Sequence, residues 1–273
     1  MLRSSLAFLR RAPILASLCA MLTPLAAQQA STAGFDHTHA RWTAVLQSCV
    51  RDGGFDYAKL KQDRSSLDAV LAALQAVTPD ELAGWNEKQR FAFWINTYNA
   101  HCIQKVVDNY PLKSIRKLDG AFGINTVFDK GFIPMKAHHP DKKNEALALN
   151  DIEHKILRRQ FKDARLHAAI NCASKSCPPL RNEAYAAEKL DAQLDEQMRA
   201  FVNDPARNHI DPVKKELELS EIFKWFAEDF ERDAKSVKDY LIRFVSSDKA
   251  ELVRGAKIRY LDYDWDLNDV SSK

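Results

Sequence analysis

A long helical pattern at residues 87–109 constrains the fold of this 273-residue chain more than any other feature. Apolar side chains recur there at steps of three and four, which predicts a helix with one apolar face, ended by Pro111. The residues of that face are Phe91, Trp94, Ile95, Tyr98, Cys102 and Val106. Asn96 and Asn99 fall on a neighbouring face, and asparagine is a poor residue for a helix interior. If these amides are buried, each must find hydrogen-bond partners.

Further helical and strand-like patterns follow one another along the rest of the chain. The predicted helices lie at about residues 40–50, 67–77, 150–161, 184–202, 220–230 and 237–245. The predicted strands and extended pieces lie at about residues 124–128, 131–135, 164–171, 217–219 and 258–265. We find no internal repeat and no domain linker. The sequence therefore predicts an α+β fold, a single helix-rich domain around a small β-sheet at residues 40–273.

The first 27 residues have the composition of a secretory signal peptide. The segment 1–11 is basic and contains no acid, the segment 12–25 is apolar, and two alanines follow it. The apolar run is too short for a comfortable membrane span, although a retained N-terminal anchor is an alternative. We therefore predict cleavage after Ala27, a flexible leader at residues 28–39, and a soluble protein secreted to the periplasm.

The charge of the chain depends on this segment. The whole sequence has 40 Lys and Arg against 37 Asp and Glu, but three of the arginines lie in residues 1–27. Without them, the mature chain has 37 bases and 37 acids. Neither nucleic acid nor a stable membrane contact is therefore predicted as a partner, because both would call for a broad basic or apolar surface.

Six blocks of the sequence run in the order of one known family. They are 91–100 (FAFWINTYNA), 110–115 (YPLKSI), 149–158 (LNDIEHKILR), 165–180 (RLHAAINCASKSCPPL), 219–225 (LSEIFKW) and 260–268 (YLDYDWDLN). Together they resemble the domain-of-unknown-function 547 family of bacteria and plants, over nearly the whole predicted domain. As its name records, that family has no settled activity. Its members occur alone in secreted bacterial proteins and elsewhere fused to other modules, including glutaredoxin-like ones, so the resemblance is compatible with thiol chemistry.

The block at 165–180 holds the densest group of chemically useful side chains. A cysteine nucleophile must form a thiolate near neutral pH, which needs a base or a cationic neighbour within reach. If residues 164–171 form a strand, the loop after it can return Cys177 toward His167. The Cys-Pro-Pro sequence also suits the start of a turn or helix, where free backbone N–H groups would hold an oxyanion. We therefore predict Cys177 as the nucleophile and His167 as the base.

Further polar residues are predicted to support this pair. Asn99 or Glu153 would orient the imidazole of His167, and Asp264 is an alternative. The residues predicted to contact the substrate are Asn96, Cys172 and Ser174. Structural explanations stay open beside these roles: Glu153 follows Asn150 by three residues and suits a helix cap. A histidine on an apolar strand, and asparagines in a buried helix, are commonly held by hydrogen bonds in a core.

The mature chain contains four cysteines, and only Cys172 and Cys177 are close in sequence. In an oxidising compartment these two can form a loop disulfide. They can also form a redox-active pair, although their spacing differs from Cys-x-x-Cys. Cys49 and Cys102 fall on apolar helix faces and are predicted to be buried and unreactive.

No motif predicts a cofactor or a metal site. The chain has only 8 glycines and no Gly-rich phosphate loop,. His138 and His139 lie beside Asp141 without the spacing of a ligand set such as His-Glu-x-x-His. Papain- and transglutaminase-like enzymes offer a loose analogy, since they combine a helix, a sheet, a cysteine and a histidine. In those enzymes the cysteine precedes the histidine, which is the reverse of the order here.

Two functional hypotheses remain open at this point. The first is a thiol-dependent hydrolase or acyltransferase that acts on an amide or ester of a small molecule or peptide. The second is a non-catalytic binding or scaffold module in which a Cys172–Cys177 disulfide shapes a surface loop.

Overall fold

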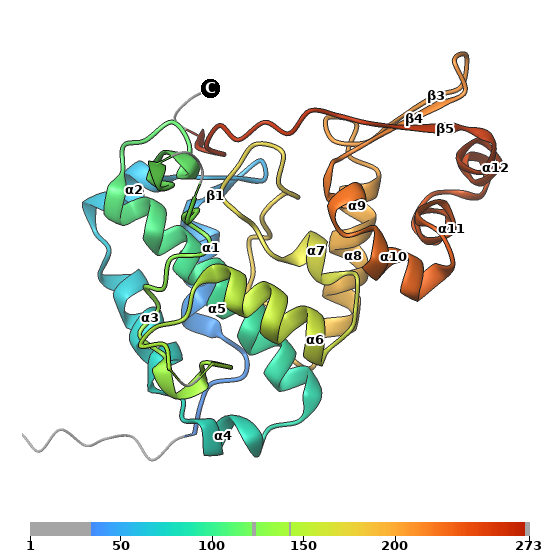
Figure 1. Cartoon of the computed structure of the whole chain (residues 1–273). Helices are drawn as coiled ribbons and strands as arrows, with labels where there is room; N and C mark the ends of the chain where they lie inside the picture. The colour runs from blue at the N-terminus through green and yellow to red at the C-terminus, as the bar shows by residue number, and fades with distance from the viewer. Residues whose placement is uncertain (1–33, 122–123, 142, 271–273) are drawn as a thin grey trace, which may run out of the picture. The chain divides into compact units, whose positions relative to one another are not determined.

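The computed structural model describes residues 34–121, 124–141 and 143–270 (Figure 1). The predicted signal peptide and residues 28–33 of the predicted leader lie outside the described residues. Phe35–Lys273 form one compact unit, which combines helices with two small sheets. The predicted α+β class is therefore confirmed, although the structure has two sheets where the sequence predicted one.

Helix α5 (Glu87–Asn109) is the most deeply buried long element and has the bounds that the sequence predicted. Asn86 opens it with a capping box, in which the Asn86 side chain accepts the N–H of Gln89 and the Gln89 side chain accepts the N–H of Asn86,. Every residue from Phe91 to Ile103 is buried. The prediction of one apolar face was therefore too narrow, because other elements surround this helix on all sides.

Four helices and a hairpin precede α5. The helices are α1 (Ala40–Cys49), α2 (Tyr57–Gln62), α3 (Ser65–Ala76) and α4 (Pro79–Ala83). Helices α2 and α3 pack on α5, and α1 packs on α3. The hairpin pairs β1 (Val50–Arg51) with β2 (Gly54–Phe55) in antiparallel register. Asp52 and Gly53 both have positive φ, as a two-residue type I′ turn requires,.

The middle of the chain departs most from the prediction. Its helical elements are η1 (Ile115–Leu118), η3 (Lys136–His138), η4 (Asp151–Leu157), α6 (Arg158–Gln160) and α7 (Leu166–Ala169). The predicted strands at 124–128 and 131–135 are wrong: this stretch contributes only an isolated bridge between Ile133 and Leu147. The predicted strand at 164–171 is also wrong and contains the helical turn α7 instead. Asp163 starts this turn, because its side chain accepts the Arg165 N–H at 2.9 Å and its carbonyl accepts the Leu166 N–H at 3.2 Å.

The C-terminal part combines short helices with a three-stranded sheet. β3 (His209–Asp211) pairs antiparallel with β4 (Glu216–Leu219), and β4 pairs in parallel with β5 (Lys257–Tyr260). The helices are α8 (Leu190–Val202), α9 (Ile222–Trp225), α10 (Ala227–Ala234), α11 (Val237–Ile242) and α12 (Ser247–Gly255). The helix predicted at 184–202 begins only at Leu190. The helix predicted at 220–230 breaks at Phe226, whose φ of −115° and ψ of 26° are not helical,.

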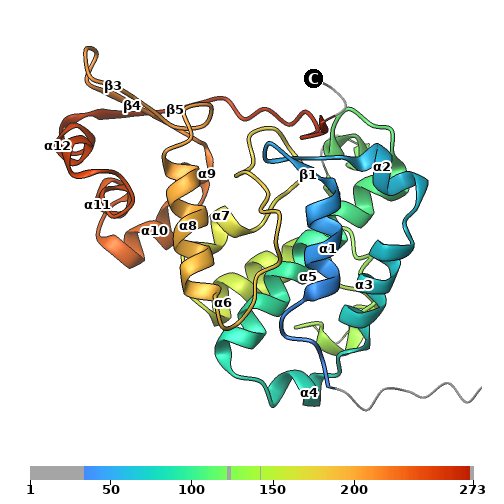
Figure 2. The same ribbon diagram turned by 180° about the vertical axis from the view of Figure 1, so that it is seen from behind.

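Buried apolar side chains form two groups. The first surrounds α1 to α5 and η4, and the second lies between α8 and the helices that follow β4. Helix α7 contributes to both, because Leu166 and Ala169 belong to the first group and Ala168 belongs to the second. The loop that leaves α7 therefore starts where the two groups meet, a region seen from both sides in Figures 1 and 2.

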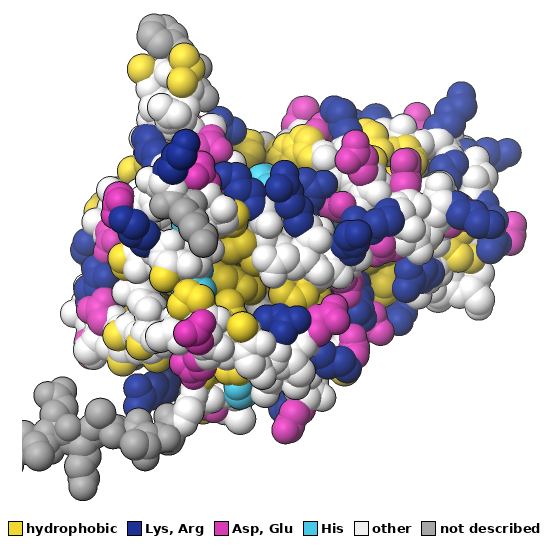
Figure 3. Space-filling view, turned by 60° about the horizontal axis from the view of Figure 1, so that its bottom comes forward, with side chains coloured by type: hydrophobic (Ala, Val, Ile, Leu, Met, Phe, Trp, Pro, Cys, Tyr) yellow, Lys and Arg dark blue, Asp and Glu magenta, His cyan; other side chains and the backbone are white. Residues whose placement is uncertain are grey.

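The surface carries charges of both signs. Lys and Arg side chains are interspersed with Asp and Glu over the face in Figure 3, and hydrophobic side chains gather in a hollow near its middle. Among the described residues, no helix combines the length and apolar character needed to cross a membrane.

Candidate thiol site

A small pocket lies beside the loop that follows α7. Its volume is about 160 Å³, and both cysteines of the loop, Cys172 and Cys177, line it. The other lining residues are Tyr98, Phe128, Asn150, Glu153, His154, His167, Ile170, Pro178, Ile222, Trp225, Phe226, Tyr263 and Trp265. Segments far apart in the sequence therefore each supply part of the wall.

Two asparagine side chains fix the backbone of this loop. From α5, Asn99 donates to the carbonyl of Ala169 at 2.9 Å and accepts the N–H of Asn171 at 2.8 Å. Asn171 in turn donates to the carbonyl of Pro178 at 2.9 Å and accepts the N–H of Ala173 at 2.8 Å. Both amides are buried, so removing either would leave backbone groups of the loop without partners,.

The C-terminal segment and Arg207 hold the loop from another side. The Lys175 N–H donates to the carbonyl of Asp266 at 2.8 Å. The Arg207 guanidinium donates to the carbonyl of Cys177 at 2.5 Å and to that of Lys175 at 2.8 Å. In Figure 1 the loop after α7 rises to meet this C-terminal segment. Contacts to the loop backbone therefore set the positions of both sulfur atoms.

Several hydrogen-bond donors surround the sulfur of Cys177. The Cys172 N–H, the Ser174 hydroxyl and the Tyr263 hydroxyl lie 3.0, 3.2 and 3.3 Å from its Sγ. Burial raises the pKa of this thiol, but hydrogen bonds from the Cys172 thiol, Ser174 and Tyr263 outweigh it and lower the pKa of Cys177 to about 6. The thiolate is then the main form at neutral pH. The predicted nucleophile thus has a suitable environment, supplied by hydrogen-bond donors.

The pKa of Cys172 is shifted in the opposite direction. Its thiol donates a hydrogen bond to Cys177 and is half-buried, and both effects raise its pKa above the ordinary range. Cys172 and Cys177 are free thiols in this structure. The arrangement therefore combines a thiolate with a neighbouring protonated thiol.

The expected backbone oxyanion site after Cys177 is not formed. No helix starts at Pro178, and the Cys177 N–H already donates to the carbonyl of Ser174 at 3.1 Å. Pro178 and Pro179 have no N–H to offer. Donors for an oxyanion must therefore come from side chains of the pocket.

Glu153 is a member of the pocket rather than a helix cap. Asn150 does not cap η4, because its side chain donates to Asp129 at 2.5 Å. Asp151 takes the capping role instead and accepts the Ala148 N–H at 2.8 Å. The element is wound as a π-helix, a geometry that is common at functional sites,. The predicted capping box is therefore wrong, and the Glu153 carboxyl group is available to the pocket.

The carboxyl group of Glu153 has an unusual acidity. Burial raises its pKa to about 7, and the charge of Cys177 adds to this effect. Arg158 and a hydrogen bond from Tyr98 act in the opposite direction and lower it. At neutral pH the group is divided between acid and carboxylate, which is the condition for proton transfer in both directions.

His167 lies on α7 and forms a buried pair with Asp229. The Nε2 atom of the ring lies 2.8 Å from Asp229 Oδ2. Burial opposes ionisation of Asp229, but hydrogen bonds from His167 and Arg158 hold its pKa below the usual range. Burial also lowers the pKa of His167 to about 4, although Asp229 opposes this. Because a neutral ring beside a carboxylate carries its proton on Nε2, Nδ1 is left as an acceptor, and Nδ1 has no hydrogen-bond partner,.

Asp229 therefore orients the imidazole, in place of the residues predicted for that role. Asn99 binds the loop backbone, as described above. The backbone carbonyl of Asp264 accepts the Ser176 N–H at 3.2 Å. Glu153 lines the same pocket as His167, but the hydrogen bond to the ring comes from Asp229.

The three residues predicted to contact the substrate do not all lie at the pocket. Asn96 does not line the pocket, because its amide donates to the carbonyl of Tyr185 at 2.7 Å and accepts the Tyr185 N–H at 3.1 Å. Ser174 is fully buried, and its hydroxyl contacts Cys177 and Tyr263. Of the three predicted residues, only Cys172 lines the pocket.

Aromatic side chains form the remaining wall. Tyr263 packs against both Trp225 and Trp265, with ring centroids 4.7 Å apart in each pair. Phe226 stacks on His167 at 3.8 Å. Trp225 is 45% exposed and forms the solvent side of this group. The thiol, the carboxyl group and the imidazole thus share a small space enclosed largely by rings.

Comparison with known families supports the resemblance seen in the sequence. A family model described as "Protein of unknown function, DUF547" matches residues 82–202. This segment belongs to the DUF547 family. It carries Tyr98, Asn99, Glu153, His167 and both loop cysteines. Comparisons with curated proteins and with solved structures gave no match, so the likeness to papain- and transglutaminase-like enzymes stays a prediction.

Three residues of the site were missed by sequence reasoning. Tyr98 falls on the apolar face of α5 and was interpreted as core. Tyr263 lies beyond the DUF547 match but inside the family block 260–268, which was a signal for it. Asp229 lies outside all six blocks, and nothing in the sequence connects it with His167, 62 positions earlier.

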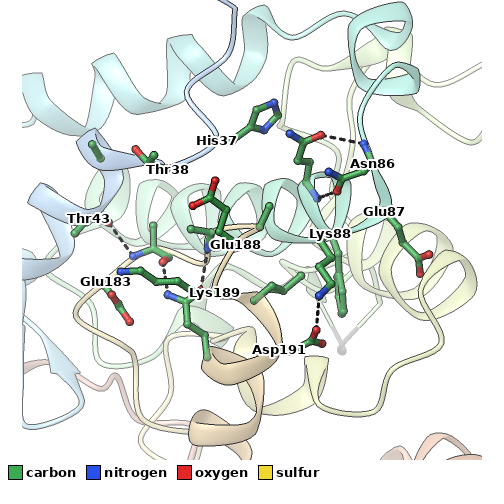
Figure 4. A pocket seen from close by; sticks show the side chains of 18 of the residues that line it. His37, Thr38, Thr43, Asn86, Glu87, Lys88, Glu183, Glu188, Lys189 and Asp191 are labelled. Atoms are coloured by element: carbon green, nitrogen blue, oxygen red, sulfur yellow. Dashed lines mark hydrogen bonds and ion pairs between the residues drawn. The ribbon is translucent and has the colours of Figure 1, made fainter.

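A larger cavity of about 1040 Å³ lies between α1, the start of α5 and residues 183–191 (Figure 4). Its charged side chains neutralise each other in part, as Lys88 and Asp191 do at 2.5 Å. Thr43 in its wall accepts the Ala184 N–H at 3.1 Å. None of the described residues that line this cavity is a cysteine. We therefore take the smaller pocket beside Cys177 as the candidate site.

The histidines considered for metal binding have structural contacts. His139 lies 3.1 Å from Asp151, and its other ring nitrogen accepts the Asp141 N–H at 2.9 Å. His138 contacts the carbonyl of Val77 at 2.7 Å. Over the described part of the chain, no group of three or more His, Cys, Asp or Glu side chains is arranged to hold a metal ion.

Proposed function

We propose that this chain is a thiol-dependent hydrolase or acyltransferase in which Cys177 is the nucleophile and Glu153 is the general acid and base. The observation that carries the proposal is one pocket lined both by Cys177, whose sulfur has hydrogen-bond donors at 3.0 to 3.3 Å, and by the buried Glu153; the donors lower the pKa of the thiol and burial raises that of the carboxyl group. Groups whose environments push their pKa values in opposite directions are typical of acid–base catalysis. Glu153 replaces His167 as the base because a pKa of about 7 suits proton transfer at neutral pH better than a pKa of about 4,.

In the acylation step, the Cys177 thiolate attacks the carbonyl carbon of an ester or amide. A C–S bond forms, and the π electrons of the carbonyl group move to its oxygen. Tyr98 and Tyr263 line the pocket, and their hydroxyls, which hydrogen-bond to Glu153 and Cys177 before the reaction, are the donors that we assign to this oxyanion,. The C=O bond then re-forms, the bond to the leaving group breaks, and protonated Glu153 gives its proton to the departing alcohol or amine.

In the deacylation step, water attacks the thioester carbon while the Glu153 carboxylate takes one of its protons. The C–S bond breaks, Cys177 leaves as the thiolate, and the carboxylic acid product departs. Glu153 is again protonated, so the cycle consumes one water for each bond cleaved. An amine or alcohol in place of water gives acyl transfer by the same steps.

Acylation of Cys177 by activated esters tests this proposal. Near pH 6.5 the protein should release about one equivalent of p-nitrophenol from a p-nitrophenyl ester in a burst, and mass spectrometry should find the acyl group on Cys177. Cys177→Ala should abolish the burst. Cys49→Ala, a change at a buried cysteine on α1 outside the pocket, should keep it once circular dichroism shows that both variants are folded.

Two results would contradict the proposal. One is a Cys177→Ala protein that retains the wild-type burst. The other is a wild-type protein on which no ester of the series leaves an acyl group at Cys177, an outcome that favours the scaffold hypothesis.

A further inference from the structure

The pocket beside Cys177 has a size and a lining that select one class of acyl group. We propose that it accepts a compact acyl group without negative charge, of aromatic or branched aliphatic character and about six or seven carbon atoms, for which benzoyl is the model. This inference rests on the proposed function and names the substrate class of the same thiol.

The volume sets the size of the group. The pocket has a volume of about 160 Å³ and is partly open to solvent. An apolar cavity of about 150 Å³ in another protein binds one benzene molecule, so a single ring or a branched chain of similar size fills such a space. A much larger acyl group would have to displace the walls, which close-packed side chains resist.

The walls are held in place by their own contacts. Tyr263 packs against both Trp225 and Trp265, and its hydroxyl lies 3.3 Å from Cys177 Sγ. Phe226 stacks on the imidazole of His167, which Asp229 fixes. Because these rings support one another, we expect a sharp upper limit on the size of the acyl group.

The lining disfavours negatively charged groups. No Lys or Arg is among the described residues that line the pocket. Burial lowers the pKa values of its two histidines, His154 and His167, so neither offers a positive charge at neutral pH. An anionic acyl group would therefore lose its hydration without gaining a partner of opposite charge. It would also meet the Cys177 thiolate and, where ionised, the carboxylate of Glu153.

Labelling of Cys177 by methanethiosulfonates measures this preference without requiring turnover. In each reaction the thiolate attacks the sulfenyl sulfur, a mixed disulfide forms and methanesulfinate leaves. The reagents carry benzyl, 2-naphthylmethyl and 2-sulfonatoethyl groups. Rates at Cys177 in the folded protein are read by peptide mass spectrometry and divided by the rates for free 2-mercaptoethanol. The benzyl reagent should be at least about ten-fold faster than the other two on this normalised scale.

Two variants locate the size limit. Trp225→Ala removes a half-exposed wall residue and should bring the naphthylmethyl rate close to the benzyl rate. Leu252→Ala, at a 42% exposed apolar residue that does not line the pocket, should leave the wild-type ratios unchanged.

Equal normalised rates for the benzyl and sulfonatoethyl reagents, or for the benzyl and naphthylmethyl reagents, would overturn the inference. A folded Trp225→Ala protein with wild-type ratios would overturn the assignment of the limit to this wall. Different outcomes separate a failure of the proposed function from a failure of the pocket preference. If labelling follows the expected order but p-nitrophenyl benzoate leaves no acyl group on Cys177, the pocket preference stands and catalysis does not. If burst acylation occurs with equal rates for p-nitrophenyl benzoate and 2-naphthoate, catalysis stands and the pocket preference does not.

Discussion

Replacing Glu153 by glutamine tests the buried carboxyl group without reference to catalysis. Burial raises the pKa of Glu153 from 4.5 to about 7 in the folded chain. A raised pKa means that the folded chain holds this proton more tightly than the unfolded chain does. The stability that the group contributes is therefore complete below pH 4.5 and is lost as the pH rises toward 7. A difference of about 2.5 pKa units corresponds to about 3 kcal/mol of unfolding free energy.

Glutamine keeps the shape of the side chain but does not ionise. Between pH 5 and pH 8 the wild-type protein should therefore lose about 2 to 3 kcal/mol relative to Glu153→Gln. Urea unfolding at the two pH values measures the difference. Glu228→Gln, at an exposed position of α10, is the matched control and should show no such pH dependence. Repeating the pair in a Cys177→Ser background removes the influence of the nearby thiolate on Glu153.

A stability difference that stays constant from pH 5 to pH 8 would refute this reasoning. It would mean that the carboxyl group ionises in the folded chain as readily as in the unfolded one. A difference of the opposite sign would mean that Arg158 and Tyr98, which lower the pKa of Glu153, outweigh its burial.

Three further predictions concern the thiol. Acylation needs the Cys177 thiolate and protonated Glu153, so its rate should rise with pH through about pH 6 and fall through about pH 7,. Glu153→Gln should remove the fall in rate above pH 7. Asn99→Ala should lower the free energy of unfolding by about 2 to 4 kcal/mol, because two buried hydrogen bonds are lost, and should move the pH midpoint of Cys177 alkylation toward that of a free thiol,. Asn96→Ala should lower the free energy of unfolding by a similar amount and leave that midpoint unchanged,. Iodoacetamide without reductant should label Cys177 before the other cysteines, and a pre-existing Cys172–Cys177 crosslink would contradict this.

Periodic patterns predicted the long elements because those elements bury side chains at regular spacing. Helix α5 has the predicted bounds, and α3 and β4 lie where apolar residues indicated them. The run at 164–171 failed because a short apolar segment does not distinguish a strand from a buried helical turn. Hydrogen bonds to Asp163 and Asp233 favour the helical turn over a strand in this segment. The Asp233 side chain accepts the Ala164 N–H at 2.9 Å and lies 69 positions away in the sequence.

Sequence reasoning likewise predicted only part of the candidate site. Cys177, Glu153 and His167 do line one pocket, and all three lie in blocks that the sequence singled out. The partner of His167 could not be predicted, because Asp229 reaches it only through the packing of α7 on the C-terminal helices. Asn96 and Asn99 are equivalent by sequence, and only the fold separates the one that holds Tyr185 from the one that holds the cysteine loop.

The way the cysteine loop is held bears on both functional hypotheses. In the scaffold hypothesis a disulfide is needed to shape the loop. In the structure, Asn99, Asn171 and Arg207 already bind its backbone, and the two thiols stay free. A loop fixed from α5, a helix buried on all sides, has the rigidity that a reactive group needs,. Since these contacts fix the shape of the loop without a crosslink, they favour the proposed function over the scaffold hypothesis, and under that proposal the donors around Cys177 serve to hold a thiolate.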